Sequence, residues 1–266
     1  MSDKTAQTSI PNQTLVLLGA SNLSLAWPRI MSALYSGLSG QSHIYTAHGM
    51  GRSYIYPDSA CGFRKLPGIL CSGIWDALLI TINENQSFAL ITDLGNDLLY
   101  GSNAVEVAQS AEESIRRLRA WSPECRIVMT RPPVESVRKL GWLRFFVART
   151  ILFPLTRLTL TATQTETLKL DQLLVDIADH LEVSLIKPDP VWYGVDPIHV
   201  RWRSQHAAFS QILAEWFDTS DNATTKQRLP ATLTKRPLAE LRWLCGLEKR
   251  TCQPAIAARD VSIFAY

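Results

Sequence analysis

An uninterrupted apolar run followed by a tight turn most constrains the fold of this chain. Residues 15–18 are Leu, Val, Leu and Leu, and they lead directly into Gly19, Ala20, Ser21 and Asn22. A short run that is apolar at every position is typical of a strand buried on both faces, as in parallel sheets covered by helices. Because the next residues suit a helix entry, the stretch predicts strand, turn and helix, with Ser21 at the carboxyl edge of a sheet.

The rest of the chain alternates between strand-like and helix-like segments. We expect further strands at residues 42–47, 88–94, 126–130 and 183–186, and helices at 25–38, 74–82, 105–121, 161–181 and 204–217. Strands that alternate with helices predict parallel pairing with the helices on both faces. The expected fold class is therefore α/β: a three-layer α/β/α sandwich around a mainly parallel sheet of about five strands.

Composition narrows the class of protein. With 266 residues, of which 46% are hydrophobic, the chain can bury a substantial core. A net charge of +3 is too small to indicate a nucleic-acid partner. The first ten residues lack the apolar core of a signal peptide, so we expect a cytoplasmic protein. Five cysteines without close pairs argue against a disulfide framework and against a structural zinc site.

Three further segments place glycine or polar residues where loops are expected. Gly51 follows the second strand, and a glycine there lets backbone approach a ligand closely. Asn96 follows the third strand, where its side-chain N–H can either enter the crevice near Ser21 or serve the turn. Asp196 and His199 lie three residues apart in a proline-containing loop before the last expected helix.

Together these segments resemble the SGNH, or GDSL-type, hydrolase superfamily. That family has a nucleophilic serine after the first strand, a glycine after the second, an Asn in a Gly-x-Asn-Asp-like block and a late Asp-x-x-His. The matching pieces, spread over roughly residues 14–217, are Gly19-Ala-Ser21, Gly51, Gly95-Asn96-Asp97 and Asp196-Pro-Ile-His199. The resemblance implies the flavodoxin-like fold of the SGNH hydrolases.

Two residues depart from the family pattern. Ala20 stands where an aspartate usually precedes the serine, and Asn22 occupies a position that is commonly small or leucine. Gly49 is an alternative to Gly51 in the second block, which we assign to Gly51 because Arg and Ser follow it. The nucleophile turn is therefore the part of the pattern where the chemistry can differ or be absent.

The residue types in these blocks suit acyl chemistry. Ser21 would be the nucleophile, His199 the base that takes its proton, and Asp196 the residue that orients the imidazole. The Ser21 and Gly51 backbone N–H groups and the Asn96 amide would form the oxyanion hole. This chemistry needs no metal and no organic cofactor.

The sequence therefore predicts a serine esterase or acyl hydrolase that forms an acyl-enzyme from a small-molecule, lipid or carbohydrate ester. An acyltransferase using the same site and a catalytically inactive binding protein of the same fold are the alternatives. A nucleotide-binding domain is less favoured, because the first turn lacks a complete Gly-x-Gly-x-x-Gly. Neither nucleic acid nor a particular oligomeric state is indicated.

Two segments do not fit the alternation of strands and helices. Residues 134–160 contain the aromatic and aliphatic stretch 140–155, which could be a packed helix, a lid over an apolar acyl pocket, or an interfacial helix that contacts a membrane. Residues 219–266 form a basic extension to a hydrolase domain at 1–218, and apolar spacing predicts a docked helix at 237–247.

Overall fold

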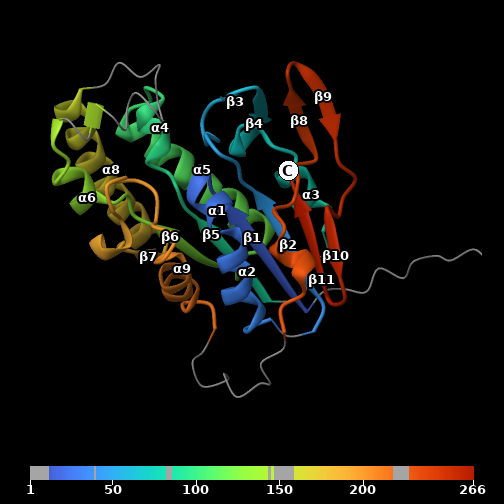
Figure 1. Ribbon diagram of the computed structural model, residues 1–266. Helices are drawn as coiled ribbons and strands as arrows, with labels where there is room; N and C mark the ends of the chain where they lie inside the picture. The colour runs from blue at the N-terminus through green and yellow to red at the C-terminus, as the bar shows by residue number, and fades with distance from the viewer. Residues whose placement is uncertain (1–11, 39, 82–85, 143–144, 147–158, 218–227) are drawn as a thin grey trace, which may run out of the picture.

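The computed structural model describes residues 12–38, 40–81, 86–142, 145–146, 159–217 and 228–266 (Figure 1). The strands of its main sheet are β1 (Gln13–Leu18), β2 (Ser42–Ala47), β5 (Gln86–Ile91), β6 (Arg126–Thr130), β7 (Ser184–Ile186), β10 (Ile256–Ala258) and β11 (Val261–Ala265). Their order is β10-β11-β2-β1-β5-β6-β7, and every neighbouring pair except β10–β11 is parallel. A second sheet has the order β3-β4-β8-β9 and consists of β3 (Asp58–Cys61), β4 (Arg64–Pro67), β8 (Leu241–Leu244) and β9 (Leu247–Arg250).

Helices cover both faces of the main sheet. The α-helices are α1 (Ser21–Leu25), α2 (Trp27–Tyr35), α3 (Ile74–Leu79), α4 (Asn96–Leu99), α5 (Ala104–Trp121), α6 (Val134–Arg138), α8 (Leu160–His180) and α9 (Gln205–Leu213). Short 3₁₀ helices are η1 (Ile69–Cys71), η2 (Pro190–Trp192) and η4 (Ala231–Thr234). Apolar residues of α3, α5 and α8 pack on one face of the sheet, and those of α1, α2 and α9 pack on the other.

The core explains why residues 15–18 form an unbroken apolar run. All six residues of β1 are buried, and the side chains of residues 15–18 alternate between the two apolar clusters on opposite faces of the sheet. The predicted α/β class and three-layer arrangement are confirmed. The sheet has seven strands rather than about five, because β10 and β11 extend it beyond β2.

The predicted helix at residues 237–247 is wrong. Residues of this segment form β8, which pairs antiparallel with β4 and continues through a hairpin into β9. Cys245 and Gly246 connect the two strands with φ values of 49° and 79°. Two successive residues with positive φ interrupt a helix and suit a two-residue hairpin turn, so local geometry overrides the helical spacing of the leucines.

The segment 134–160 is only partly described. Its first residues form α6, whereas residues 143–144 and 147–158 lie outside the described part of the chain. The three interpretations of residues 140–155 therefore stay open. Among the helices that the structure describes, none combines the length and the apolar character needed to cross a bilayer.

Candidate functional site

The four predicted site segments follow the carboxyl ends of β1, β2, β5 and β7. β1 lies at the centre of the sheet, and the chain crosses from β1 to β2 on one side and later returns to β5 on the other (Figure 1). The carboxyl edge at such a change of direction is where open α/β sheets bind ligands, since loops leave it in opposite directions. The topology therefore brings the turns after β1, β2 and β5 to one edge.

The turn after β1 presents Ser21 as the first residue of α1. Gly19 is needed there because a Cβ at this position would lie 2.7 Å from the Thr92 Cγ2 atom. Ala20 is the N-cap of α1 and has no side chain that could accept a hydrogen bond. Ser21 itself is 4% exposed.

Asp93, two residues after the end of β5, supplies the carboxylate that this turn lacks. Its Oδ2 atom accepts hydrogen bonds from the backbone N–H groups of Ala20 at 2.7 Å, Asn22 at 3.0 Å and Leu23 at 3.3 Å. The Ser21 N–H does not bond to Asp93, and within the described ranges it has no hydrogen-bond acceptor. That N–H therefore stays available to a ligand.

Asp196 and His199 are in direct contact. The Nδ1 atom of His199 lies 2.6 Å from an oxygen of Asp196, whose other oxygen accepts the backbone N–H of His199 at 3.1 Å. Burial alone would lower the pKa of His199, but the hydrogen bond and charge of Asp196, with a smaller contribution from Asp93, raise it overall. Burial alone would raise the pKa of Asp196, but the hydrogen bond and charge of His199, together with the backbone N–H groups of residues 198 and 199, lower it overall. The pair suits a histidine that accepts a proton at Nε2 and is stabilised when charged.

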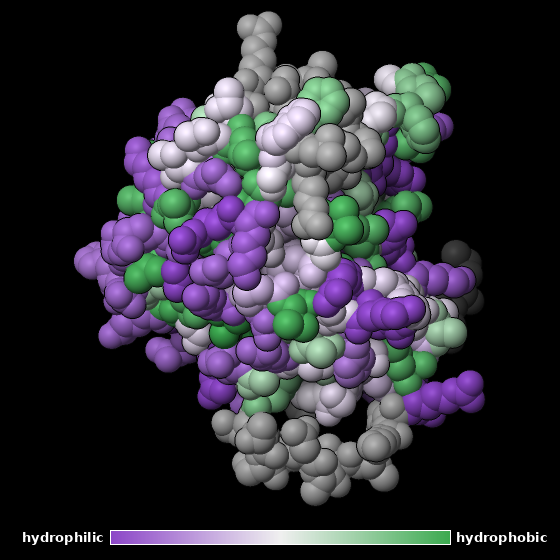
Figure 2. All heavy atoms as spheres, turned by 60° about the vertical axis from the view of Figure 1, so that its left-hand side comes forward, coloured by the Kyte–Doolittle hydropathy of each residue, from purple (hydrophilic) through white to green (hydrophobic). Residues whose placement is uncertain are grey.

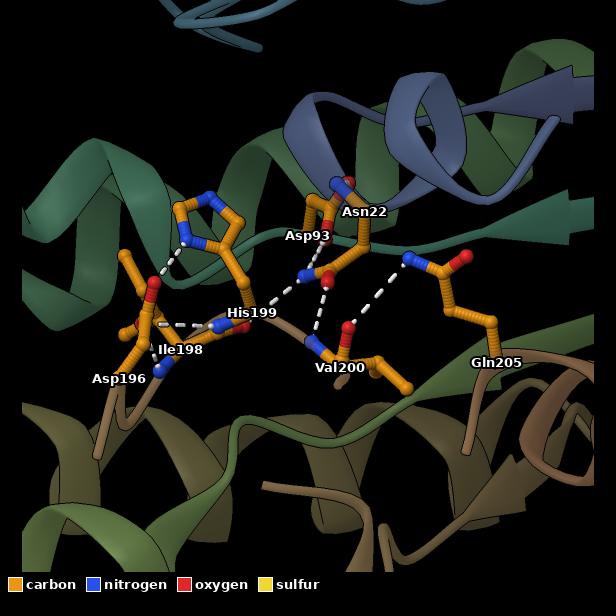
Figure 3. Close-up of polar contacts among 7 residues, drawn as sticks. All are labelled: Asn22, Asp93, Asp196, Ile198, His199, Val200 and Gln205. Atoms are coloured by element: carbon orange, nitrogen blue, oxygen red, sulfur yellow. Dashed lines mark hydrogen bonds and ion pairs between the residues drawn. The ribbon is translucent and has the colours of Figure 1, made fainter. Parts of the chain in front are cut away.

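Asn22 joins the turn after β1 to the loop that contains His199. Its Nδ2 group donates to Asp93 Oδ1 at 2.7 Å and to the Ile198 carbonyl at 2.9 Å, and its Oδ1 atom accepts the Val200 N–H at 2.8 Å. Figure 3 shows this amide between Asp93 and the main chain on either side of His199. Since Asn22 follows Ser21, the serine and the histidine belong to segments that are hydrogen-bonded to each other.

The predicted oxyanion donors other than Ser21 come from the turns after β2 and β5. Gly51 has φ of +69°, a conformation that favours glycine, and Asn96 begins α4. In the described part of the chain, neither the Gly51 N–H nor the Asn96 side-chain amide has a hydrogen-bond partner. Both therefore retain a donor for a ligand, as the Ser21 N–H does.

Tyr54 and Asp97 hold these turns to the strand ends. The buried Tyr54 hydroxyl lies 2.9 Å from the Leu18 carbonyl and 2.8 Å from the Thr92 carbonyl, at the ends of β1 and β5. Asp97, one residue after Asn96, accepts the Tyr54 backbone N–H at 2.9 Å and the Ser53 hydroxyl. Burial raises the pKa of Asp97 to about 6, although these hydrogen bonds oppose the shift.

An apolar cavity of about 90 Å³ adjoins this edge of the sheet. Its walls include Asn22 and Asn96 together with Leu98, Val137 and Trp192. Residues of α6, α8 and α9 also line it. The side of the molecule with α6 and α8 is turned forward in Figure 2, where polar and apolar surface residues are interspersed. The cavity can hold an apolar substituent close to the polar groups of the site.

The structure shows no obvious metal site in the residues it describes, which contain no group of three or more His, Cys, Asp or Glu that could hold an ion. All five cysteines are free, and only Cys125 is buried.

The sequence predicted Ser21, Gly51, Asn96, Asp196 and His199 as site residues and gave no role to Asp93. It also treated Asn22 only as a departure from a pattern. One signal was present: an acidic residue just after β5, two positions before Gly95, in a chain with Ala20 where the resembling family usually has aspartate. The pairing across 73 positions appears only in three dimensions.

Comparisons with known proteins agree with this fold. No protein-family model matches the sequence, and no curated protein matches it. Among solved structures, a protein from Agrobacterium tumefaciens strain C58, named for a proposed arylesterase activity, is 17% identical with a TM-score of 0.50, covering 76% of this chain and 96% of its own. The inhibitor-bound aryl esterase of M. smegmatis is 14% identical with a TM-score of 0.50, covering 76% of this chain and 97% of its own.

Structural similarity at such low sequence identity shows the fold and nothing beyond it. The chain has the α/β/α fold of esterases of this kind, as its resemblance to the SGNH/GDSL-type hydrolases predicted.

Proposed function

We propose that this protein is a serine esterase that hydrolyses carboxylic esters through an acyl-enzyme on Ser21. The observation that carries the proposal is the 2.6 Å contact between His199 and Asp196, in a loop that is hydrogen-bonded to Asn22, the residue after Ser21. An acid, an imidazole and a serine on adjoining segments are the parts that acyl transfer to serine requires.

Each residue has a defined step. Neutral His199 takes the Ser21 proton at Nε2 while Ser21 Oγ bonds to the ester carbonyl carbon. The Ser21 N–H, the Gly51 N–H and the Asn96 amide stabilise the negative oxygen of the tetrahedral intermediate. The intermediate expels the alcohol, which takes the proton from His199. Water then attacks the acyl-enzyme by the same route and releases the acid.

The apolar cavity supports an ester with an apolar acyl or aryl group. It borders Asn96, the proposed oxyanion donor, so an acyl carbonyl at that donor would direct its substituent toward Leu98 and Val137. Burial of apolar surface there contributes about 25 cal/mol per Å². Small-molecule and lipid esters both satisfy this requirement.

A fluorophosphonate probe and short-chain nitrophenyl esters test the proposal together. Wild-type protein should be labelled on the peptide that contains Ser21, and both labelling and hydrolysis should fall by at least about 10⁴-fold in Ser21→Ala and His199→Ala. Ser24→Ala is the matched control, since Ser24 lies one turn further along α1 and donates to the Ala20 carbonyl. It should be labelled like the wild type. Equal hydrolysis by wild type, Ser21→Ala and His199→Ala would end the proposal.

A further inference from the structure

We propose that Asn22 and Asp93 are a positioning pair that holds the His199 backbone beside the Ser21 turn and replaces the aspartate missing at residue 20. The inference rests on the proposed function, in which Ser21 and His199 react together. It assigns a role to the two departures that the sequence pattern left unexplained.

Asp93 is the fixed end of the pair. Its carboxylate accepts four hydrogen bonds, three from backbone N–H groups around Ser21 and one from the Asn22 side chain. It also has φ of +66°, a conformation that Asp, Asn and Gly tolerate better than other residues. A carboxylate in this position holds the turn after β1 to the end of β5.

Asn22 is the end that reaches the histidine. Its Nδ2 group faces two acceptors, Asp93 Oδ1 and the Ile198 carbonyl, whereas its Oδ1 atom faces one donor, the Val200 N–H. This pattern fixes the orientation of the amide, because the reverse orientation would set its NH₂ against an N–H. Serine is too short for both contacts, and aspartate offers no donor to Asp93, so the arrangement is specific for an amide at residue 22.

The two contacts lie on either side of His199. One goes to residue 198 and the other to residue 200, so Asn22 fixes the main chain from which the imidazole leaves. Asp196 has a different task, since it bonds the ring nitrogen and sets the tautomer. Loss of Asn22 should therefore displace a correctly polarised imidazole, and a displacement of about 1 Å can cost on the order of 10² in rate.

The closing experiment measures fluorophosphonate labelling rates in Asn22→Ala, Asp93→Asn and the double variant. Asp93→Asn keeps a residue that tolerates positive φ but turns an NH₂ group toward the Asn22 amide. We expect each single variant to be labelled about 10²-fold more slowly. The double variant should be no slower than the slower single variant, because both changes break the same link.

Two further measurements separate positioning from a loss of stability. In nitrophenyl ester hydrolysis, kcat should fall in Asn22→Ala while KM stays unchanged, and the pH midpoint should not move because Asp196 is intact. Asn103→Ala is the control, since Asn103 caps the remote helix α5 and its side chain also accepts backbone N–H groups. It should be destabilised by a comparable amount and be labelled at the wild-type rate.

Hydrogen exchange at the Val200 N–H tests the contact itself without any reaction. Its protection should fall in Asn22→Ala while that of β6 is unchanged, and Asp93→Asn gives the same test if Asn22→Ala does not fold. Labelling within threefold of wild type in both single variants, multiplicative losses in the double variant, or unaltered Val200 protection would overturn the pair. A wild-type protein that is not labelled at Ser21 would instead overturn the proposed function, and Val200 exchange would still decide whether the contact exists.

Discussion

Replacing Tyr54 by phenylalanine removes a single hydroxyl that joins two strand ends beneath the candidate site. The side chain is fully buried, and its oxygen contacts the Leu18 and Thr92 carbonyls at the ends of β1 and β5. The change keeps the ring and opens almost no cavity. Its effect therefore reports the hydrogen bonds alone.

The structure sets the size of the effect. The Leu18 carbonyl keeps a partner in the variant, because the Thr92 N–H also donates to it at 2.9 Å. Among the described residues the Thr92 carbonyl has only the Tyr54 hydroxyl, so it becomes a buried acceptor without a donor. Such a group costs about 1–3 kcal/mol of unfolding free energy. For a chain of this size the melting temperature falls by about 2–4 °C per kcal/mol.

Denaturant unfolding followed by circular dichroism measures this loss, and fluorophosphonate labelling measures its effect on Ser21. We expect Tyr54→Phe to lower both the unfolding midpoint and the labelling rate, since Gly19 and Asp93 directly follow the two joined strand ends. Tyr56→Phe is the matched control, because its side chain is exposed and its hydroxyl makes only long hydrogen bonds, donating to the Tyr100 carbonyl at 3.3 Å and accepting from the Ser102 hydroxyl at 3.5 Å. If the two variants unfold and react alike, the hydroxyl does not hold the strand ends and the reasoning fails.

Three further predictions test the site. Because the pKa of His199 is raised above 6.5, the labelling rate of the wild type should increase with pH through a midpoint above that value. Asp196→Asn should lower both the midpoint and the plateau, and an unmoved midpoint would contradict the role of Asp196 as the partner of His199. Val137→Phe should fill part of the apolar cavity and reduce kcat/KM for hexanoate relative to acetate esters by about 10-fold or more, whereas an unchanged ratio would place the acyl group elsewhere. Burial raises the pKa of Asp97 from 3.8 to about 6, so the folded state binds this proton more tightly than the unfolded state does. The free energy of unfolding should therefore fall by about 3 kcal/mol as the pH rises from below 3.8 to above 6. Unfolding curves of Asp97→Asn should not show this pH-dependent loss.

The parallel core could be predicted because its signals are local. Four of the six residues of β1 form a continuous apolar run, which is what a strand buried on both faces leaves in the sequence. The glycines and polar residues that end these strands were likewise readable, since parallel strands bring their carboxyl ends to one edge. The histidine loop was found from its Asp-x-x-His spacing, and the 2.6 Å contact agrees with that reading.

The C-terminal strands could not be predicted because their partners are distant. β11 pairs with β2, and β8 pairs with β4, across more than 170 positions in each case. Short segments with mixed exposure carry no clear period of their own, so the leucine spacing at 237–247 favoured a helix. Whether these segments become strands or helices depends on the free edges of β2 and β4, with which they pair.

The turn after β1 also depends on a partner that is distant in the sequence. That partner changes how Ala20 and Asn22, the two departures from the family pattern, are understood. What the turn requires is a carboxylate that accepts the N–H groups of residues 20, 22 and 23, and nothing in that requirement fixes where the carboxylate lies in the chain. Asp93 meets it from β5, so Ala20 removes no interaction that this turn needs. Once the carboxylate comes from β5, residue 22 can face it, and an amide there can bond the carboxylate and the histidine loop together. Ala20 and Asn22 are therefore two parts of one arrangement, because both are explained by the carboxylate of Asp93.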